Sequence, residues 1–236
     1  MIFKRSILPT LLDSLLPGKV VVLYGPRQVG KPTLCQELIR ECPFSSKFIN
    51  ADELMFREVL SSQNSQKLGE ILSDAELLVI DEAQRVPEIG LNLKLMVDSF
   101  PNVRIIATGS SSFDLANRIS EPLTGRALTY TLFPISFTEI SNTLGKLEAR
   151  SQLERWLIWG GYPAISANDN PAFREQLLGN LVGSYLYKDI LEMDGIRRSD
   201  KIVNLLRLLA FQIGKEVSIA ELATSLALHR QTVERY

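Results

Sequence analysis

The sequence predicts an α/β protein in which helices cover both faces of a parallel sheet, followed by a mostly helical region. Two observations lead to this fold class. Between residues 19 and 134, short unbroken runs of Val, Ile and Leu alternate with stretches whose apolar residues recur at helical spacing. Such runs are typical of strands buried on both faces of a parallel sheet. After about residue 135 the runs fade and only helical periodicity remains.

The apolar runs place five strands in the first region. We expect these strands at residues 20–25, 47–50, 77–82, 103–109 and 127–133. Helical spacing predicts helices within the segments 33–42, 89–100, 151–161, 173–193, 200–214 and 219–236. The alternation of strand and helix in the first region indicates a layered α/β domain.

The overall charge is nearly balanced, with 26 Lys and Arg against 27 Asp and Glu. This balance argues against electrostatic binding of nucleic acid or of an anionic membrane by the protein as a whole. No apolar run approaches the roughly 20 residues that span a bilayer, and the N-terminus lacks the features of a signal peptide. The two cysteines, Cys35 and Cys42, show no disulfide pattern. We therefore expect a cytoplasmic protein without membrane contact.

Residues 25–33, GPRQVGKPT, follow the first predicted strand directly and lead into a helix. This order of strand, glycine-rich segment and helix is the context in which GxxxxGK forms a phosphate-binding loop. Backbone N–H groups and the helix N-terminus would face the phosphates, and Lys31 would contact the β and γ phosphates. The alternative is a plain glycine turn. The predicted nucleotide-binding residues are Gly25, Pro26, Arg27, Gln28, Val29, Gly30, Lys31, Pro32 and Thr33.

Two further strands end in polar residues where ligands bind in open α/β sheets, at the carboxyl edge. The run LLVIDE ends in Asp81 and Glu82. We expect Asp81 to hold Mg²⁺ through water and Glu82 to orient or deprotonate the attacking water. The run RIIATGSSS places Thr108 or Ser110 where a hydroxyl would contact the γ-phosphate or that water. Alternatively, these hydroxyls cap the following helix.

With these segments in this order, the chain resembles an AAA-type P-loop ATPase. More narrowly, it resembles bacterial and archaeal ATP-binding proteins whose AAA domain is followed by a helical lid, a winged helix and a nuclease-like domain of unknown function. The matching stretches are GPRQVGK, VIDEAQRVP, TGSSS, LTGR, LFPISFTEI, GGYPA and YLYKDIL.

The resemblance implies a P-loop NTPase sheet that is sandwiched by helices. In this sheet the hydroxyl strand (residues 103–109) lies between the loop strand (20–25) and the acid strand (77–82). The resemblance also implies an AAA-type nucleotide-binding domain at residues 1–135, a helical lid at 136–196 and a truncated winged helix at 197–236. The ligands implied are ATP or ADP with Mg²⁺. The nuclease-like domain has no counterpart in this sequence, and the sequence ends at Tyr236 inside a helical pattern. We therefore expect a truncated chain.

Arginines are also assigned by resemblance. AAA-type assemblies often present an arginine to the γ-phosphate of a neighbouring subunit, which would make this protein a homo-oligomer. Arg126 in LTGR is the better candidate, and Arg118 is the other. The alternative for either is a structural ion pair or an exposed side chain.

Pro32 stands where the resemblance predicts Thr, and it lacks both the metal-binding hydroxyl and a backbone N–H. Thr33 offers a hydroxyl one residue later, but one residue turns a helical side chain by about 100°. Thr33 is therefore a weak substitute as a metal ligand beside Asp81. We expect an ATP-binding protein whose Mg²⁺-dependent ATPase activity, with Lys31, Glu82, Thr108 and Arg126 as catalytic candidates, is weakened by Pro32. The alternative is a nucleotide-binding switch without useful turnover that acts on DNA or on a protein partner.

The C-terminal segment has the pattern of a helix-turn-helix. Apolar positions at helical spacing lead to a turn at residues 227–229 and then to RQTVERY. A DNA-reading helix would direct Arg230, Gln231 and Arg235 toward the groove. Residues 197–236 carry seven Lys or Arg and four Asp or Glu, a net charge of +3. Contact with DNA is therefore one interpretation of this segment, and a lid element that packs against protein is the other.

Overall fold

The structure is a computed structural model of the whole chain, and it describes residues 3–109, 122–183 and 199–235. These residues form two compact units, Met1–Asn170 and Pro171–Tyr236. The boundary falls inside the segment predicted as a helical lid, so the helices up to residue 166 belong with the sheet. No helix in the described ranges is both long and apolar enough to cross a membrane.

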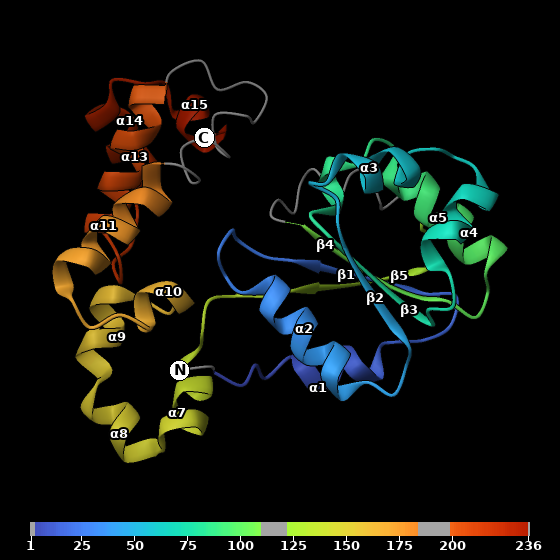
Figure 1. Cartoon of the computed structure of the whole chain (residues 1–236). Helices are drawn as coiled ribbons and strands as arrows, with labels where there is room; N and C mark the ends of the chain where they lie inside the picture. Colours follow the sequence, from blue (N-terminus) through green and yellow to red (C-terminus); the bar gives the residue numbers. More distant parts are fainter. Residues whose placement is uncertain (1–2, 110–121, 184–198, 236) are drawn as a thin grey trace. The chain divides into compact units, whose positions relative to one another are not determined.

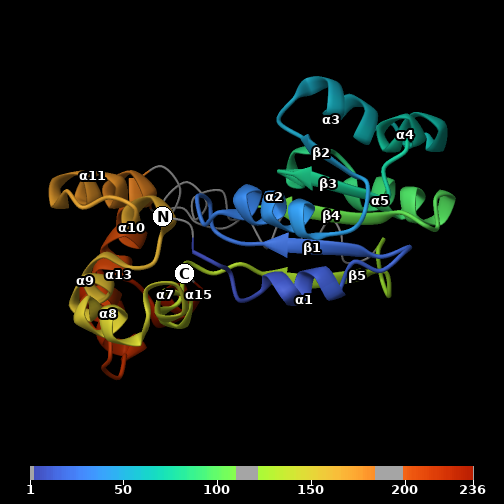
Figure 2. The same ribbon diagram turned by 60° about the horizontal axis from the view of Figure 1, so that its bottom comes forward.

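The first unit contains a sheet of five parallel strands in the order β2-β3-β4-β1-β5 (Figure 2). The strands are β1 (Val20–Tyr24), β2 (Ser46–Asn50), β3 (Leu77–Asp81), β4 (Arg104–Gly109) and β5 (Ala127–Thr131). All five strand predictions are confirmed to within one or two residues at each end. The hydroxyl strand β4 lies between the loop strand β1 and the acid strand β3, as the resemblance implied.

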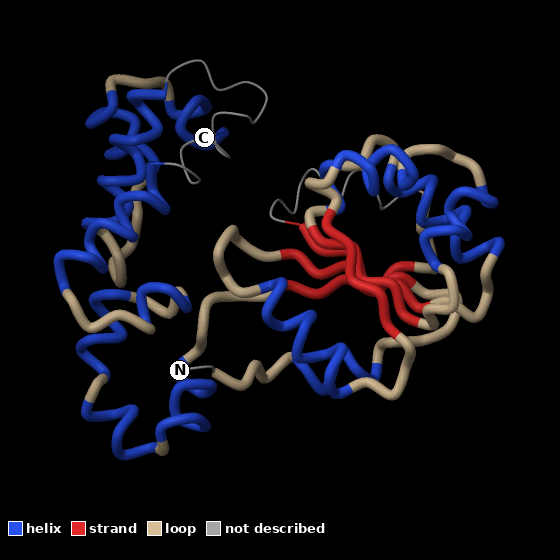
Figure 3. The backbone as a smooth tube through the Cα atoms, in the orientation of Figure 1, coloured by secondary structure: helices blue, strands red, loops and turns tan. Residues whose placement is uncertain are grey.

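Helices cover both faces of this sheet (Figures 1 and 3). One face packs against α1 (Leu8–Asp13) and α2 (Lys31–Glu41). The other packs against α3 (Leu54–Leu60), α4 (Ser65–Leu72) and α5 (Ile89–Ser99). The short 3₁₀ helix η1 spans Ala83–Arg85.

The central strands divide their side chains between these two apolar cores. In β1, Val21 and Leu23 join the core under α1 and α2, whereas Val20 and Val22 join the core on the opposite face. Alternation with period two explains why an unbroken apolar run is needed to fill both cores. The α/β fold class with a helix-covered parallel sheet is therefore confirmed.

Within its described residues, the first unit also contains four helices after β5. They are α7 (Phe137–Leu144), α8 (Lys146–Ser151), α9 (Leu153–Trp159) and α10 (Pro163–Ser166). Phe3 joins their apolar cluster, and its ring meets Trp156 edge to face with 5.8 Å between ring centroids. The chain before the sheet is thereby attached to the helices after it.

The second unit is helical in its described residues. It contains α11 (Pro171–Leu181), α13 (Ser199–Phe211), α14 (Ile219–Leu226) and α15 (Arg230–Arg235). Its core includes Leu205 of α13, Leu222 and Leu226 of α14, and Val233 of α15. Ala227 ends α14 in the left-handed conformation, with φ 49°, so the two helices and the turn predicted around residues 227–229 are present.

Candidate functional site

Three polar segments meet at the carboxyl edge of the sheet. Tyr24, the last residue of β1, pairs with Gly109 of β4, and Ile80 of β3 pairs with Ala107 of β4. The loop after β1, Thr108 and Asp81 therefore emerge at the same edge, because all of these strands run in parallel. This is the edge at which open α/β sheets bind ligands.

Both glycines of the loop have a local structural cause. Gly30 has φ 99°, a left-handed conformation that glycine adopts without strain, and it precedes Lys31, the first residue of α2. A Cβ atom on Gly25 would stand 2.5 Å from the carbonyl oxygen of Leu132, just beyond β5. Gly25 is therefore required by a close backbone approach from the neighbouring strand as well as by the loop itself.

Lys31 is buried, with 3% of its surface exposed. Its Nζ donates hydrogen bonds to the carbonyl oxygens of Gly25 (2.7 Å) and Pro26 (3.1 Å). Burial lowers the pKa of Lys31 from its ordinary value, and the carboxylates of Glu82 and Asp81 oppose that shift. The amine is thus held inside the loop, within electrostatic reach of both acids.

Asp81 and Thr108 are buried and bonded to each other. The Thr108 hydroxyl donates to Asp81 Oδ1 at 2.5 Å and accepts from the Glu82 backbone N–H at 3.4 Å. A donor role of Thr108 toward a phosphate would therefore require this hydroxyl to exchange partners. Glu82 is half-buried, and its Oε2 accepts from Gln84 Nε2 at 2.5 Å. Its backbone is left-handed, with φ 55°, an uncommon conformation for a residue other than glycine.

Pro32 lies exposed in the first turn of α2, where its missing N–H costs the helix nothing. Thr33 is also exposed and lines a cavity beside the loop. Mg²⁺ is commonly bound in proteins by one or two carboxylates together with phosphate oxygens and water. Asp81, a buried carboxylate beside the loop, suits such an ion when phosphates are present, but Pro32 supplies no hydroxyl to it.

Arg126 lies at the opposite edge of the sheet. It precedes β5, whose first residue pairs with Val20 at the start of β1. Its guanidinium forms an ion pair with Asp98, with an NH2 to Oδ1 distance of 2.9 Å. Arg126 therefore does not reach the loop of its own chain, and a role toward a neighbouring subunit stays a prediction. Ser110 and Arg118 lie outside the described residues.

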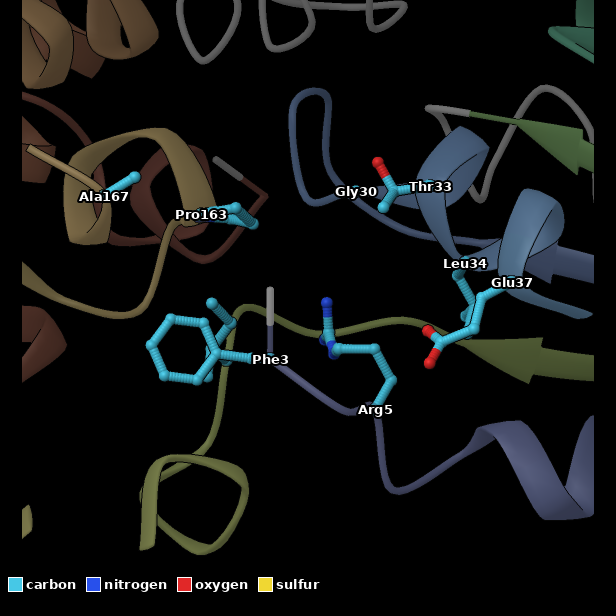
Figure 4. A pocket seen from close by; sticks show the side chains of 9 residues that line it. Phe3, Arg5, Gly30, Thr33, Leu34, Glu37, Pro163 and Ala167 are labelled. Carbon is cyan, nitrogen blue, oxygen red and sulfur yellow. The ribbon is translucent and has the colours of Figure 1, made fainter. Parts of the chain in front are cut away.

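A cavity of about 240 Å³ opens beside the loop (Figure 4). Gly30, Thr33 and Leu34 line one side, and Pro163 and Ala167 at the two ends of α10 line the other. Its remaining lining residues are Phe3, Arg5, Glu37 and Ile135. The cavity is mainly apolar and borders the loop that follows β1.

Arg5 and Glu139 were not among the site residues predicted from the sequence. The Arg5 guanidinium reaches the carbonyl oxygen of Val29 in the loop, and its Nε donates to Glu139 in α7. The pattern SFTE at residues 136–139 does indicate a helix capping box, which the structure contains. No local pattern indicates the pairing with Arg5, because 134 residues separate the two side chains.

A family model described as an AAA domain, AAA_14, matches residues 17–141, more than half of the chain. The chain belongs to this AAA family. The match begins just before β1 and ends within α7, so it covers the loop, the acid strand and the hydroxyl strand of the AAA domain. Residues 150–236 match a second family model, described as a domain of unknown function, DUF8612. Neither description names a winged helix or a nuclease.

Curated relatives of this AAA chain come from bacteria and archaea. An uncharacterized protein of Methanocaldococcus jannaschii is 28% identical over 94% of this chain and 53% of its own length. One from Mycobacterium tuberculosis is 29% identical over 100% of this chain and 51% of its own length. The chain thus spans about half the length of these relatives.

Two solved structures are similar at low sequence identity. The Pif1 helicase of Candida albicans matches with a TM-score of 0.41 and 15% identity, over 61% of this chain and 42% of the helicase. A Signal Transduction ATPase with Numerous Domains from Pyrococcus horikoshii matches with a TM-score of 0.48 and 13% identity, over 89% and 34% of the two chains.

Proposed function

We propose that this AAA domain binds ATP or ADP at the loop Gly25–Thr33 and hydrolyses ATP slowly, with Mg²⁺. The observation that carries the proposal is the burial of Lys31. Its amine donates hydrogen bonds to two carbonyl oxygens of the loop, and the charges of Asp81 and Glu82 favour its protonated form. A lysine ammonium is strongly hydrated, and its burial is costly unless the site has a use for the charge. A phosphate would replace the loop carbonyl oxygens as its partner.

The remaining groups take roles around the phosphates. The mainly apolar cavity beside Gly30 accommodates part of the nucleoside. Asp81 would hold Mg²⁺ through water, and the ion would supply charge that neutralises the phosphates. Glu82 orients or deprotonates the attacking water, and its left-handed backbone fits the strained geometry common at functional sites.

Whether the site works as an enzyme or as a switch depends on how far Pro32 reduces ATP turnover. Lys31 and the remaining loop N–H groups support binding, whereas the hydroxyl that would help to hold the metal is absent. Nucleotide affinity should therefore be retained better than turnover. If turnover is negligible, the same site acts as a nucleotide-dependent switch on a DNA or protein partner.

The binding proposal is tested by calorimetry with ADP on the wild type, Lys31→Ala and Lys19→Ala. We expect the wild type and Lys19→Ala to bind alike, and Lys31→Ala to bind at least about tenfold more weakly, since about 1.4 kcal/mol corresponds to tenfold in affinity. Lys19 is a matched control because it is a half-buried lysine at the other end of β1, where its Nζ donates to the Gly125 carbonyl. Absence of binding by the wild type, or equal binding by all three proteins, would refute the proposal.

DNA contact through α15 is a second candidate function. The helices α14 and α15 are joined by a short turn, and Arg230, Gln231 and Arg235 on the second helix are exposed. This is the arrangement in which a second helix enters the major groove. Arg230 forms an ion pair with Glu234, which a DNA phosphate would have to replace.

Fluorescence anisotropy with a labelled duplex tests this candidate. Arg230→Ala should weaken binding and reduce the salt dependence by about one phosphate contact, a change of roughly 0.9 in the slope of log K against log salt. The control is Arg207→Ala, which removes an exposed arginine from α13 in the same unit. Equal effects of the two substitutions would indicate diffuse electrostatics, and no binding by the wild type would exclude the candidate.

A further inference from the structure

Arg5 connects three segments that are far apart in the sequence. Its NH1 donates to the carbonyl oxygen of Val29 in the loop at 3.1 Å, and its NH2 donates to the carbonyl oxygen of Phe133 after β5. Its Nε donates to Glu139 Oε1 in α7 at 3.2 Å. The side chain is only 8% exposed. A guanidinium offers five N–H donors in a fixed plane, which suits a contact with several acceptors at once.

The bond to Val29 fixes the orientation of one peptide group in the loop. The structure has no cis peptide bond among its described residues, and in a trans peptide the C=O and the following N–H point in opposite directions. Because the Val29 carbonyl faces Arg5, the Gly30 N–H faces away from Arg5. Gln28 and Gly30 both have positive φ, 62° and 99°. Left-handed residues in such a loop turn backbone N–H groups toward one side, which is how anion-binding concavities form.

Glu139 keeps Arg5 in place. Its carboxylate is 7% exposed, and it accepts hydrogen bonds from the backbone N–H of Ser6 (2.8 Å) and from that of Ser136 (2.9 Å) in addition to Arg5. Burial raises the pKa of Glu139, but these N–H donors and the arginine outweigh it, so the pKa lies below its usual value. The acid is therefore charged at neutral pH and opposes the Arg5 charge from a fixed position at the start of α7.

We propose that Arg5 is a positioning residue of the phosphate loop, and that Glu139 holds it so that a carboxylate outside the loop sets the loop's affinity for phosphate. This rests on the proposed nucleotide site. Arg5 acts through the Val29 carbonyl and the Gly30 N–H rather than through a contact of its own with the nucleotide.

The test uses full-length Arg5→Met, Arg5→Lys and Glu139→Gln, with Arg150→Met as a control. Arg150 is an exposed arginine of α8, so its replacement removes the same charge from the same unit. ADP and inorganic pyrophosphate are titrated by calorimetry without metal. Arg5→Met should weaken both ligands by a similar factor of at least about tenfold. Arg5→Lys and Glu139→Gln should weaken them several-fold, and Arg150→Met should not change them.

Hydrogen exchange of the protein without nucleotide supplies the second measurement. The amide of Leu34, which donates to the Gly30 carbonyl of the loop at 3.0 Å, should exchange at least several-fold faster in Arg5→Met than in wild type and reports the order of the loop. The amides of β1 and β4 should keep their protection. A merely structural role would raise exchange throughout the unit. If Arg5→Met does not fold, Arg5→Lys and Glu139→Gln carry both measurements.

The outcomes separate this proposal from the proposed function. If ADP is weakened but pyrophosphate is not, Arg5 contacts the nucleoside and the positioning role is wrong. Unchanged loop exchange, or unchanged affinity for both ligands, also overturns it. If the wild type binds neither ligand, the proposed function fails, and loop exchange alone then decides whether Arg5 and Glu139 order the loop.

Discussion

At the scale of single residues, Pro32 preserves the backbone conformation of the site but removes groups that its chemistry would use. Gly30 precedes α2 in a left-handed conformation, and the Leu34 N–H donates to the Gly30 carbonyl at 3.0 Å, so the first turn of α2 is intact around the proline. The N–H of a residue in the first turn has no partner within the helix. Proline therefore preserves the loop backbone while removing one hydroxyl and one N–H donor.

Replacement of Pro32 by Thr should raise Mg²⁺-dependent ATP turnover at least about tenfold, equivalent to about 1.4 kcal/mol of transition-state stabilisation. The physical reason is that the new hydroxyl and N–H face the phosphates and the metal, whereas Lys31 and the other donors are shared by both proteins. ADP affinity without Mg²⁺ should change less than turnover. Steady-state phosphate release measures the effect, with Lys31→Ala as the control for contaminating ATPases.

A Pro32→Thr variant no faster than wild type would show that the proline does not limit the site. The remaining explanations would then be metal contact by Thr33 or the lack of an arginine from a neighbouring subunit.

At the scale of elements, the start of α7 ties the helices after the sheet to the loop. Ser136 and Glu139 form a capping box in which each side chain accepts from the other residue's backbone N–H. The same carboxylate receives Arg5 and the Ser6 N–H. A Cβ atom on Gly161 would stand 2.1 Å from the Ile135 carbonyl oxygen, which shows how closely the chain before α10 packs against the segment before α7.

The pKa of Glu139 predicts how the stability of this unit depends on pH. Because the folded pKa lies below the unfolded value near 4.5, the charged carboxylate stabilises the fold above that pH. This contribution is lost as the pH falls through the lower, folded pKa. At pH 7, Glu139→Gln should cost about 2 kcal/mol, the order of a hydrogen bond to a charged group, or roughly 4 to 8 °C in Tm.

The difference in Tm between wild type and Glu139→Gln should shrink steadily from pH 5 to pH 3. Glu154→Gln, which removes an exposed acid from α9, controls for the general effect of one carboxylate. A Tm difference that does not change with pH would show that the substitution acts through packing rather than through charge.

At the scale of the whole molecule, the site belongs to one of the two compact units. The loop, Asp81, Glu82, the cavity and the pair Arg5–Glu139 all lie within Met1–Asn170. This unit has its own cores on both faces of the sheet and a further apolar cluster around α7, α8 and Phe3. The second unit has a separate core of α13, α14 and α15.

A fragment ending at Asn170 should therefore bind ADP with an affinity within about threefold of the full chain, less than about 0.7 kcal/mol. Calorimetry on the two proteins, with circular dichroism to confirm folding, makes the comparison. Lys31→Ala in the fragment is the matched control. A folded fragment that binds more than tenfold more weakly would mean that residues after 170 complete the site.

The sequence by itself determined the five parallel strands and the placement of the loop, Asp81 and Thr108 at one edge of the sheet. It did so because these features follow from local rules. Strands buried on both faces need unbroken apolar runs, and the residues that follow the strands of a parallel sheet all emerge at its carboxyl edge. Lys31, Asp81 and Glu82 could be placed at this edge for the same reason, since each stands at the end of a recognisable strand or loop. Their roles stay predictions.

Only the tertiary structure brought Arg5 to the loop, paired Arg126 with Asp98 and placed Thr33 in the lining of the cavity. Each of these depends on contacts between segments distant in the sequence, as Arg5 and Glu139 show across 134 residues. The packing of helices and strands determines which side chains from distant segments become neighbours. Local periodicity does not predict that packing. The conformation of the loop, in this chain, is therefore partly decided by residues that no loop pattern contains.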